Sequence, residues 1–165
     1  MPKKKKAKKE CPCGSGANYR DCCQRFHEGA EPGSATELMR SRFSAFAKGD
    51  FPYLWRTLHP DHVDRTEERD TWIENAKKTS GPLNFRRLRI LDAEAGEATA
   101  RVLFHVVVSR HRRDASFAEL SRFAHDGEGW RYLDGTLLPN RALPKPFDDL
   151  SIPAFEALAK RVLAS

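Results

Sequence analysis

Hydrophobic side chains in the first half of the chain recur with the period of an α-helix. Ser34 followed three positions later by Glu37 has the pattern of a capping box at a helix start, and Gly49 supplies the end of that helix. The apolar stripe of this predicted helix contains Leu38, Met39, Phe43, Phe46 and Ala47. Arg40 and Arg42 lie off the stripe.

Two further helices are predicted before the middle of the chain. Asp50 caps a short helix that Pro60 closes. The next helix spans residues 66–78, where an acidic first turn favours the helix dipole, and Gly81 followed by Pro82 breaks it. The apolar positions are Phe51, Leu54, Trp55 and Leu58 in the first of these helices and Trp72, Ile73 and Ala76 in the second.

The second half of the chain changes to the alternating pattern of β-strands. Four strands are predicted, at residues 85–91, 98–109, 115–125 and 129–134, with turns at 94–97 and 126–129. The longest strand carries a core row formed by Val102, Phe104, Val106 and Val108. Helices first and an antiparallel sheet afterwards favour an α+β fold with the helices on one face of the sheet.

Polar side chains interrupt the apolar rows of the last two strands. Glu119 and Ser121 stand between two core phenylalanines of the third strand, and Trp130 and Tyr132 of the fourth strand are expected to face one way with Asp134. The candidate pocket consists of Trp72, Glu119, Ser121, Trp130 and Tyr132. A carboxylate that loses solvent in such a pocket has a raised pKa and could act as a general base.

The alternative for Glu119 is a structural carboxylate. A backbone amide, or an arginine such as Arg40 or Arg42, would then satisfy it and fix the helix against the sheet. His59 and His105 are the candidate catalytic partners, although His59 is expected at a helix end. His105 lies on the opposite alternation from the core row, so we expect it to face solvent or another subunit.

The remaining segments connect or follow these elements. Residues 28–33 contain turn-forming glycine and proline and are predicted to be a linker. Residues 139–146 are rich in proline and precede a final amphipathic helix. The apolar side of that helix contains Phe155, Leu158, Ala159, Val162 and Leu163. Homodimerisation is a further expectation, because Leu103, Val107 and Leu120 lie on the outer face of the predicted sheet.

Charge is concentrated at one end of the 165-residue chain. Of the formal net charge of +6, residues 1–10 carry +5, from six lysines and Glu10, and the other 155 residues carry +1. We expect this tail to be disordered and to be either a solubilising segment or a handle for RNA, the ribosome or an anionic membrane surface, with residues 3–9 binding nucleic acid non-specifically. No apolar run approaches the ~20 residues of a membrane span, and no secretory signal is evident, so we expect a cytoplasmic protein.

All four cysteines of the chain lie within thirteen residues, as the pairs Cys11 and Cys13 and Cys22 and Cys23, separated by a Gly-Ser-Gly turn. This spacing can bring four soft thiolates to one point, as a tetrahedral Zn²⁺ site requires. The alternatives are free or redox-active thiols and disulfides, although adjacent cysteines pair only through a strained ring. His27, one helical turn after Cys23, is the alternative fourth ligand.

The cysteine segment resembles the SEC-C motif found at the C-terminus of the SecA preprotein translocase. The shared features are Cys-Pro-Cys-Gly-Ser-Gly, Tyr19 and the second cysteine pair. The resemblance implies that Cys11, Cys13, Cys22 and Cys23 bind zinc in a small knuckle that contacts other proteins or the ribosome. It implies no catalysis, because four protein ligands leave no open position on the metal.

A second resemblance covers most of the rest of the chain. The runs at residues 37–46, 121–123 and 130–135, together with the His59-Pro60 pair, are similar to the YchJ family. That family belongs to the nuclear transport factor 2 superfamily, so the resemblance implies a cone-shaped curved antiparallel sheet packed on N-terminal helices. It implies no reaction. Many relatives carry a second SEC-C motif at the C-terminus, which this chain replaces with its proline-rich stretch and helix.

These observations divide the chain into a tail at residues 1–10, a zinc knuckle at 11–30, the α+β domain at 34–138 and a C-terminal segment at 139–165. The preferred hypothesis is a zinc-binding adaptor that contacts proteins or the ribosome, with a cone that binds a ligand or partner. One alternative is a hydrolase- or isomerase-type enzyme that uses Glu119. The other is nucleic-acid binding through the tail and the arginines Arg86, Arg87, Arg89, Arg110, Arg112 and Arg113.

Overall fold

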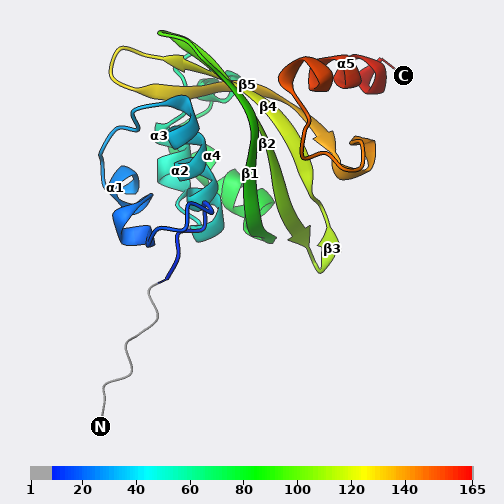
Figure 1. Ribbon diagram of the computed structural model, residues 1–165. Helices are drawn as coiled ribbons and strands as arrows, with labels where there is room; N and C mark the ends of the chain where they lie inside the picture. Colours follow the sequence, from blue (N-terminus) through cyan, green and yellow to red (C-terminus); the bar gives the residue numbers. More distant parts are fainter. Residues whose placement is uncertain (1–8, 165) are drawn as a thin grey trace.

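The computed structural model describes residues 9–164 and shows helices on both sides of a curved antiparallel sheet (Figure 1). The helices are α1 (Gln24–His27), α2 (Ala35–Lys48), α3 (Phe51–Arg56), α4 (Arg69–Ser80) and α5 (Ile152–Leu163), and 3₁₀ turns cover Tyr19–Asp21, Val63–Thr66 and Asn140–Ala142. The strands are β1 (Leu83–Ala95), β2 (Thr99–Arg110), β3 (Arg113–Asp114), β4 (Phe117–His125) and β5 (Trp130–Pro139). The predicted α+β class is confirmed. Most of the predicted disordered tail, residues 1–8, lies outside the described residues.

The sheet is a continuous antiparallel meander. The long strands follow the order β1-β2-β4-β5, and the short β3 pairs with the end of β2. Val102 is paired with Ser121 and Phe104 with Glu119, so the polar positions of β4 share a face with the core row of β2, as their alternation predicts. Two bulges in β1 add to the bend of the sheet.

Helices α2, α3 and α4 cover the hollow face of the sheet (Figure 1). Leu38, Met39 and Phe43 of α2 pack there against the inward row of β2, because the predicted apolar stripe turns toward the sheet. The strands contribute Leu88, Ala100, Val102, Phe104, Val106, Val108, Phe123 and Trp130 to this core. A neighbouring cluster holds α3 and α4 together through residues that include Leu54, Trp55 and Ile73.

The predicted caps fix both ends of α2 and the start of α3. Ser34 Oγ accepts a hydrogen bond from the Glu37 amide at 3.1 Å, and the Glu37 carboxylate accepts one from the Gly33 amide at 2.8 Å. Gly49 ends α2 with a φ of 74°, a left-handed conformation that glycine adopts without a Cβ clash. Asp50 Oδ1 then caps α3 at 3.1 Å from the Tyr53 amide.

The helix predicted at residues 66–78 begins later than the sequence suggests. Val63–Thr66 forms a separate 3₁₀ turn, in which His62 Nδ1 accepts a hydrogen bond from the Asp64 amide at 3.0 Å. The Asp64 carboxylate also accepts a hydrogen bond from Trp72 Nε1 at 3.0 Å. The first bond caps the turn and the second ties it to the side of the helix, and α4 begins at Arg69.

Arg42 departs from the expectation that it lies off the buried face. Only 5% of the residue is exposed, because α3 packs over this side of α2. Its Nη1 donates hydrogen bonds to the Leu54 carbonyl at 2.9 Å and to Thr57 Oγ1 at 2.6 Å. The helix is therefore buried on more than its apolar stripe, and hydrogen bonds compensate the buried charge.

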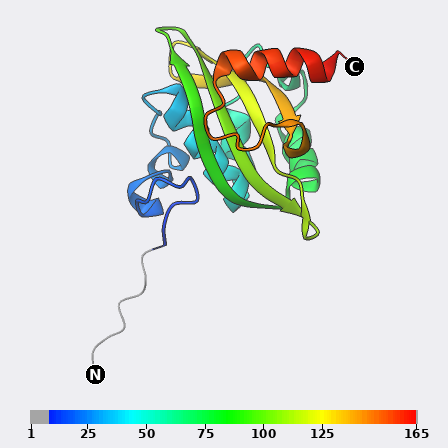
Figure 2. The ribbon, with the colours of Figure 1, turned by 45° about the vertical axis from the view of Figure 1, so that its right-hand side comes forward.

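The outer face of the sheet is covered by the end of the chain itself (Figure 2). Leu103 and Leu120 pack against Phe155 of α5 and have no more than 7% of their surface exposed, so these two residues are not free to form a dimer interface, whereas Val107 is partly exposed. His105 does not face solvent or a second subunit. It is 3% exposed, stacks on Phe147 with ring centroids 4.1 Å apart, and is bonded to Asn140.

Asp134 points away from Tyr132, contrary to the predicted alternation. A bulge pairs Arg122 with Asp134 and Phe123 with Tyr132, so that Leu133 is the extra residue of β5. The extra residue reverses the side on which the following side chains stand. Asp134 therefore lies on the outer face and forms an ion pair with Arg122.

We expect the Phe155→Ala variant to lose about 3–5 kcal/mol of unfolding free energy, because it empties a fully buried position between α5 and the sheet. Leu163→Ala is the matched control on the same helix, since Leu163 is 64% exposed, and its cost should stay within about 0.5 kcal/mol. Urea denaturation followed by circular dichroism measures both. Equal losses in the two variants would contradict the assignment of α5 as a structural cover.

Candidate metal centre

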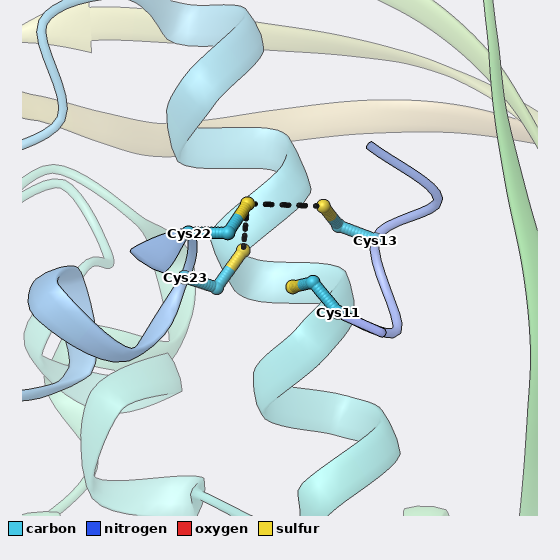
Figure 3. Close-up of side chains that lie close together, drawn as sticks. All are labelled: Cys11, Cys13, Cys22 and Cys23. Carbon is cyan, nitrogen blue, oxygen red and sulfur yellow. Dashed lines mark hydrogen bonds between the residues drawn. The ribbon is translucent and has the colours of Figure 1, made fainter. Parts of the chain in front are cut away.

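The four cysteine sulfurs lie within 4.8 Å of one another (Figure 3). Cys13 Sγ is 3.6 Å from Cys22 Sγ, which is 4.0 Å from Cys23 Sγ, and all four cysteines are free thiols without disulfides. A tetrahedral site with metal–sulfur bonds of about 2.3 Å places its sulfurs about 3.8 Å apart. The cluster therefore has the donor set and the size for one tetrahedral metal ion.

Two short segments bring the cysteine pairs together. The first pair lies in a tight loop closed by the Cys11 amide, which donates to the Ala17 carbonyl at 2.8 Å, and by a bridge between Glu10 and Asn18. Gly14 has a φ of 79° in this loop, which explains why glycine stands there. The second pair follows the Tyr19–Asp21 turn and leads directly into α1. Lys9 and Glu10, assigned to the tail from sequence, thus belong to the knuckle.

Burial and hydrogen bonds set the electrostatics of the sulfur atoms. Cys11, Cys13 and Cys23 are buried, while Cys22 is partly exposed beside Ser15, whose Oγ lies 3.2 Å from the Cys22 sulfur. Hydrogen bonding between Cys13 and Cys23 lowers the pKa of the Cys13 thiol and raises the pKa of the Cys23 thiol. Burial raises the pKa of Cys22. The four cysteines therefore favour one thiolate, and a cation is required to stabilise several thiolates so close together.

His27, the alternative fourth ligand, is committed to other partners. Its Nε2 donates a hydrogen bond to the Ser41 carbonyl at 2.8 Å, so Nδ1 is the acceptor for the Tyr19 hydroxyl at 2.6 Å. Its ring also packs against Tyr53, with centroids 4.6 Å apart. The four sulfurs gather without His27, which instead joins the cysteine segment to α2.

Further contacts fix the cysteine segment to the helical layer. Arg40 Nη1 donates to the Cys13 carbonyl at 2.9 Å, and Ser44 Oγ lies 3.4 Å from the Cys11 sulfur. Phe26 is buried in the same cluster as residues of α3. Sequence reasoning missed the roles of Arg40 and Ser44. Their spacing of four, which places both on one helix face, is the signal that could have found them.

The candidate pocket is only partly assembled. Ser121 donates a hydrogen bond to Glu119, and the Tyr132 hydroxyl lies 3.5 Å from each Glu119 carboxylate oxygen. Trp72 is elsewhere, bonded to Asp64 through its indole N–H. Trp130 lies beside His125 at the other end of β5, with ring centroids 5.6 Å apart. The expectation that the two tryptophans flank Glu119 is therefore wrong.

Neither histidine proposed as a partner approaches Glu119 in a hydrogen bond or ion pair among the described residues. His59 Nδ1 accepts from the Asp61 amide at 3.0 Å, and His105 stands on the outer face of the sheet. For a structural role of Glu119, the sequence predicted a backbone amide or an arginine as the partner of its carboxylate. Arg42 is close enough to lower the pKa of Glu119 electrostatically, but desolvation is larger and raises that pKa. The direct partners of the carboxyl group are Ser121 and Tyr132.

Two family models match the chain. The model described as the YchJ middle domain, of the NTF2-like type, matches residues 34–135, and the SEC-C motif matches residues 8–25. The chain belongs to the YchJ family. A UPF0225 protein of this family from Streptomyces coelicolor is 39% identical over 132 residues, which cover 78% of this chain and 95% of the relative. A UPF0225 protein from Sodalis glossinidius is 35% identical over 144 residues, which cover 82% of this chain and 89% of the relative.

Two solved structures of SEC-C motif containing proteins are similar to this chain. The solution structure of a SEC-C motif containing protein from Rhodopseudomonas palustris has a TM-score of 0.65 at 28% identity, covering 76% of this chain and 96% of its own. The crystal structure of a SEC-C motif containing protein from Psychrobacter arcticus has a TM-score of 0.61 at 21% identity. The match covers 81% of this chain and 86% of the Psychrobacter chain. The second likeness supports the fold alone. No helix within residues 9–164 is both long and apolar enough to cross a bilayer.

We expect His27→Ala to keep the metal stoichiometry of the unaltered protein and Cys23→Ser to reduce it. The histidine variant should still lose about 1–3 kcal/mol of stability, because the Ser41 carbonyl and the Tyr19 hydroxyl lose their partner. Elemental analysis of the two purified variants, with thermal denaturation alongside, measures both effects. Loss of metal from His27→Ala with retention in Cys23→Ser would reverse the ligand assignment.

We expect Glu119→Gln to stabilise the protein at neutral pH. Because burial raises the pKa of Glu119, the folded state holds this proton more tightly than the unfolded state. The contribution of this group to stability is therefore full below the unfolded pKa of about 4.3 and falls as the pH rises through the folded pKa. Glutamine mimics the protonated form, so the gain in melting temperature should grow from near zero at about pH 4 to a plateau at higher pH.

Glu97→Gln is the control for this pH series, because Glu97 lies on the exposed β1–β2 turn. Its melting temperature should follow that of the unaltered protein. A Glu119→Gln variant that is less stable than the unaltered protein at pH 7 would show that the charged carboxylate is the form favoured by folding.

Proposed function

We propose that Cys11, Cys13, Cys22 and Cys23 bind one Zn²⁺ in a closed structural site. The observation that carries this proposal is the approach of four sulfurs to within 4.8 Å in a SEC-C motif. Thiolate ligands favour soft or borderline ions and disfavour Mg²⁺ and Ca²⁺. Four protein ligands complete a tetrahedron, so the ion has a structural role and no coordination position for a substrate.

Native mass spectrometry of the freshly purified protein tests this proposal. We expect one zinc per chain, and we expect Cys13→Ser to remove it. Because structural zinc binding is also folding free energy, a chelator should lower the melting temperature, and the contacts of Phe26, His27 and Arg40 should extend the effect to the helical layer. A protein without stoichiometric zinc, whose cysteines alkylate rapidly in the absence of denaturant, would overturn the proposal.

The proposed activity of the protein is that of an adaptor, which contacts a protein or the ribosome through the outer surface of the cysteine knuckle. One side of the knuckle is docked on α2, and the other side is exposed at Ser15, Gly16, Arg20, Asp21 and Arg25. In the sequence, the knuckle directly follows the lysine-rich residues 3–9, whose charge favours an anionic partner. A metal-held loop presents these side chains at little entropic cost, which supports a binding role.

Nucleic-acid binding is the alternative partner hypothesis, and one feature of the sheet favours it. Arg110, Arg112 and Arg113 are exposed at the β2–β3 turn, and none of them forms an ion pair with another described residue. Exposed Arg86 and Arg87 lie on β1, the neighbouring strand. Arg89, included in the hypothesis from sequence, is instead paired with Asp148.

Charge-reversal variants distinguish partner binding at the knuckle from nucleic-acid binding at the sheet. We expect the full chain to be retained by ribosomes or by a protein from the same cell, and Arg20→Glu with Arg25→Glu to reduce that retention at least tenfold. Arg86→Glu with Arg87→Glu, which makes the same change in net charge, is the matched control and should have little effect. The reverse ranking, with strong salt dependence, would favour nucleic acid bound at the sheet. Retention of no partner by the unaltered chain would overturn the adaptor proposal.

A further inference from the structure

A cavity of about 250 Å³ lies between α2 and the hollow face of the sheet, apart from the metal centre. Its walls are mainly apolar, and five phenylalanines contribute to them: Phe43, Phe46, Phe85, Phe104 and Phe117. Phe46, Phe85 and Phe117 are partly exposed, so the cavity opens between the helical layer and the strands. An apolar cavity of about 150 Å³ can hold benzene, so this one has room for a single ring with a short substituent.

One end of the cavity is polar. Arg42, Glu119 and Tyr132 line it together, and the Arg42 guanidinium lies 4.8 Å from the centroid of the Tyr132 ring. Gly135 makes this arrangement possible, because a Cβ there would be 2.8 Å from Glu119 Cδ and 2.9 Å from the Tyr132 hydroxyl. The close approach of the β5 backbone therefore holds the carboxyl group at the wall of the cavity.

The polar groups at this end have unused hydrogen-bonding capacity. Among the described residues, Arg42 donates through Nη1 to Leu54 and Thr57, which leaves Nε and Nη2 without a hydrogen-bond partner. Glu119 accepts from Ser121, while the Tyr132 hydroxyl, at 3.5 Å, is too distant for a strong bond. A donor and an acceptor thus stand side by side at the end of an apolar pocket.

The geometry points to a binding site for a small neutral molecule that combines one aromatic ring with a group able both to donate and to accept a hydrogen bond, such as a primary carboxamide. The ring would occupy the phenylalanine-lined part of the cavity. The carbonyl oxygen would accept from Arg42, and the amide N–H would donate to Glu119. A carboxylate ligand is disfavoured by Glu119 and an ammonium ligand by Arg42, because neither repulsion is screened in an apolar pocket.

The lining favours binding over turnover. Among the described residues at the cavity, Glu119 is the only carboxyl group, and no histidine, lysine or cysteine accompanies it. The Glu119 carboxyl group is hydrogen-bonded to the hydroxyls of Ser121 and Tyr132, and among the described residues the cavity lining supplies no histidine or second carboxyl group to complete a proton relay with them. None of the four cysteines lines the cavity, so a probe titration tests this site separately from the zinc proposal.

A series of four probes of similar size tests the inference: benzamide, benzoate, benzylamine and toluene. Titration of the full-length protein, followed by the methyl resonances of Met39 and Val106, should show benzamide binding about tenfold more tightly than each of the other three. Thermal shift provides a second measurement. Tightest binding by benzoate, benzylamine or toluene, or no shift of these methyl signals by any probe, would overturn the inference.

Two variants locate the binding. Glu119→Leu should reduce benzamide affinity to that of toluene, because the amide loses its acceptor while the apolar walls remain. Val106→Leu fills the cavity without touching its polar end and should weaken toluene and benzamide alike. Each variant is first compared with the unaltered protein by circular dichroism, and Glu119→Met, whose unbranched side chain also lacks an oxygen acceptor, replaces any Glu119→Leu protein that does not fold. Unchanged benzamide affinity in both variants would show that the probe binds elsewhere.

Discussion

Helix α2 is the element on which both halves of this structure depend, because it is buried on two faces. One face packs Leu38, Met39 and Phe43 against the sheet. The opposite face receives the cysteine segment through the Ser41 carbonyl and the Arg40 side chain. A helix with polar groups on a buried face is stable only if each polar group finds a partner. The cysteine segment is one source of these partners and therefore forms part of the core.

The sequence predicted correctly those features that depend on residues close together in the chain. Regular alternation predicted the inward row of β2 and the positions of Glu119 and Ser121, because side chains on a strand change sides at every residue. The cysteine spacing predicted a sulfur cluster, because the ligands lie within thirteen residues and a short loop closes between them. Local chemistry determines both features. They could therefore be inferred without knowledge of the tertiary structure.

The failures have the opposite origin, since each depends on a partner remote in sequence. Arg42 was placed off the buried stripe because nothing nearby in the chain indicates that α3 will cover it. His105 was expected at the surface because the segment around Phe147, which covers it, comes about forty residues later. Asp134 was misplaced by a one-residue bulge, which leaves no mark in the hydrophobic pattern. Trp72 and Trp130 were grouped by residue type, and their positions in the fold separate them.

The two sites of the protein use adjacent parts of the same helix. Arg40 reaches the loop of the cysteine centre, and Arg42, two residues later, reaches the cavity. Successive positions of an α-helix point in different directions, so a helix is suited to joining two sites that do not touch. Any free energy that a metal contributes to the knuckle also holds α2 in place, and with it the Arg42 guanidinium at the polar end of the cavity. The knuckle predicted from sequence at residues 11–30 therefore contacts the helix that forms one wall of the cavity.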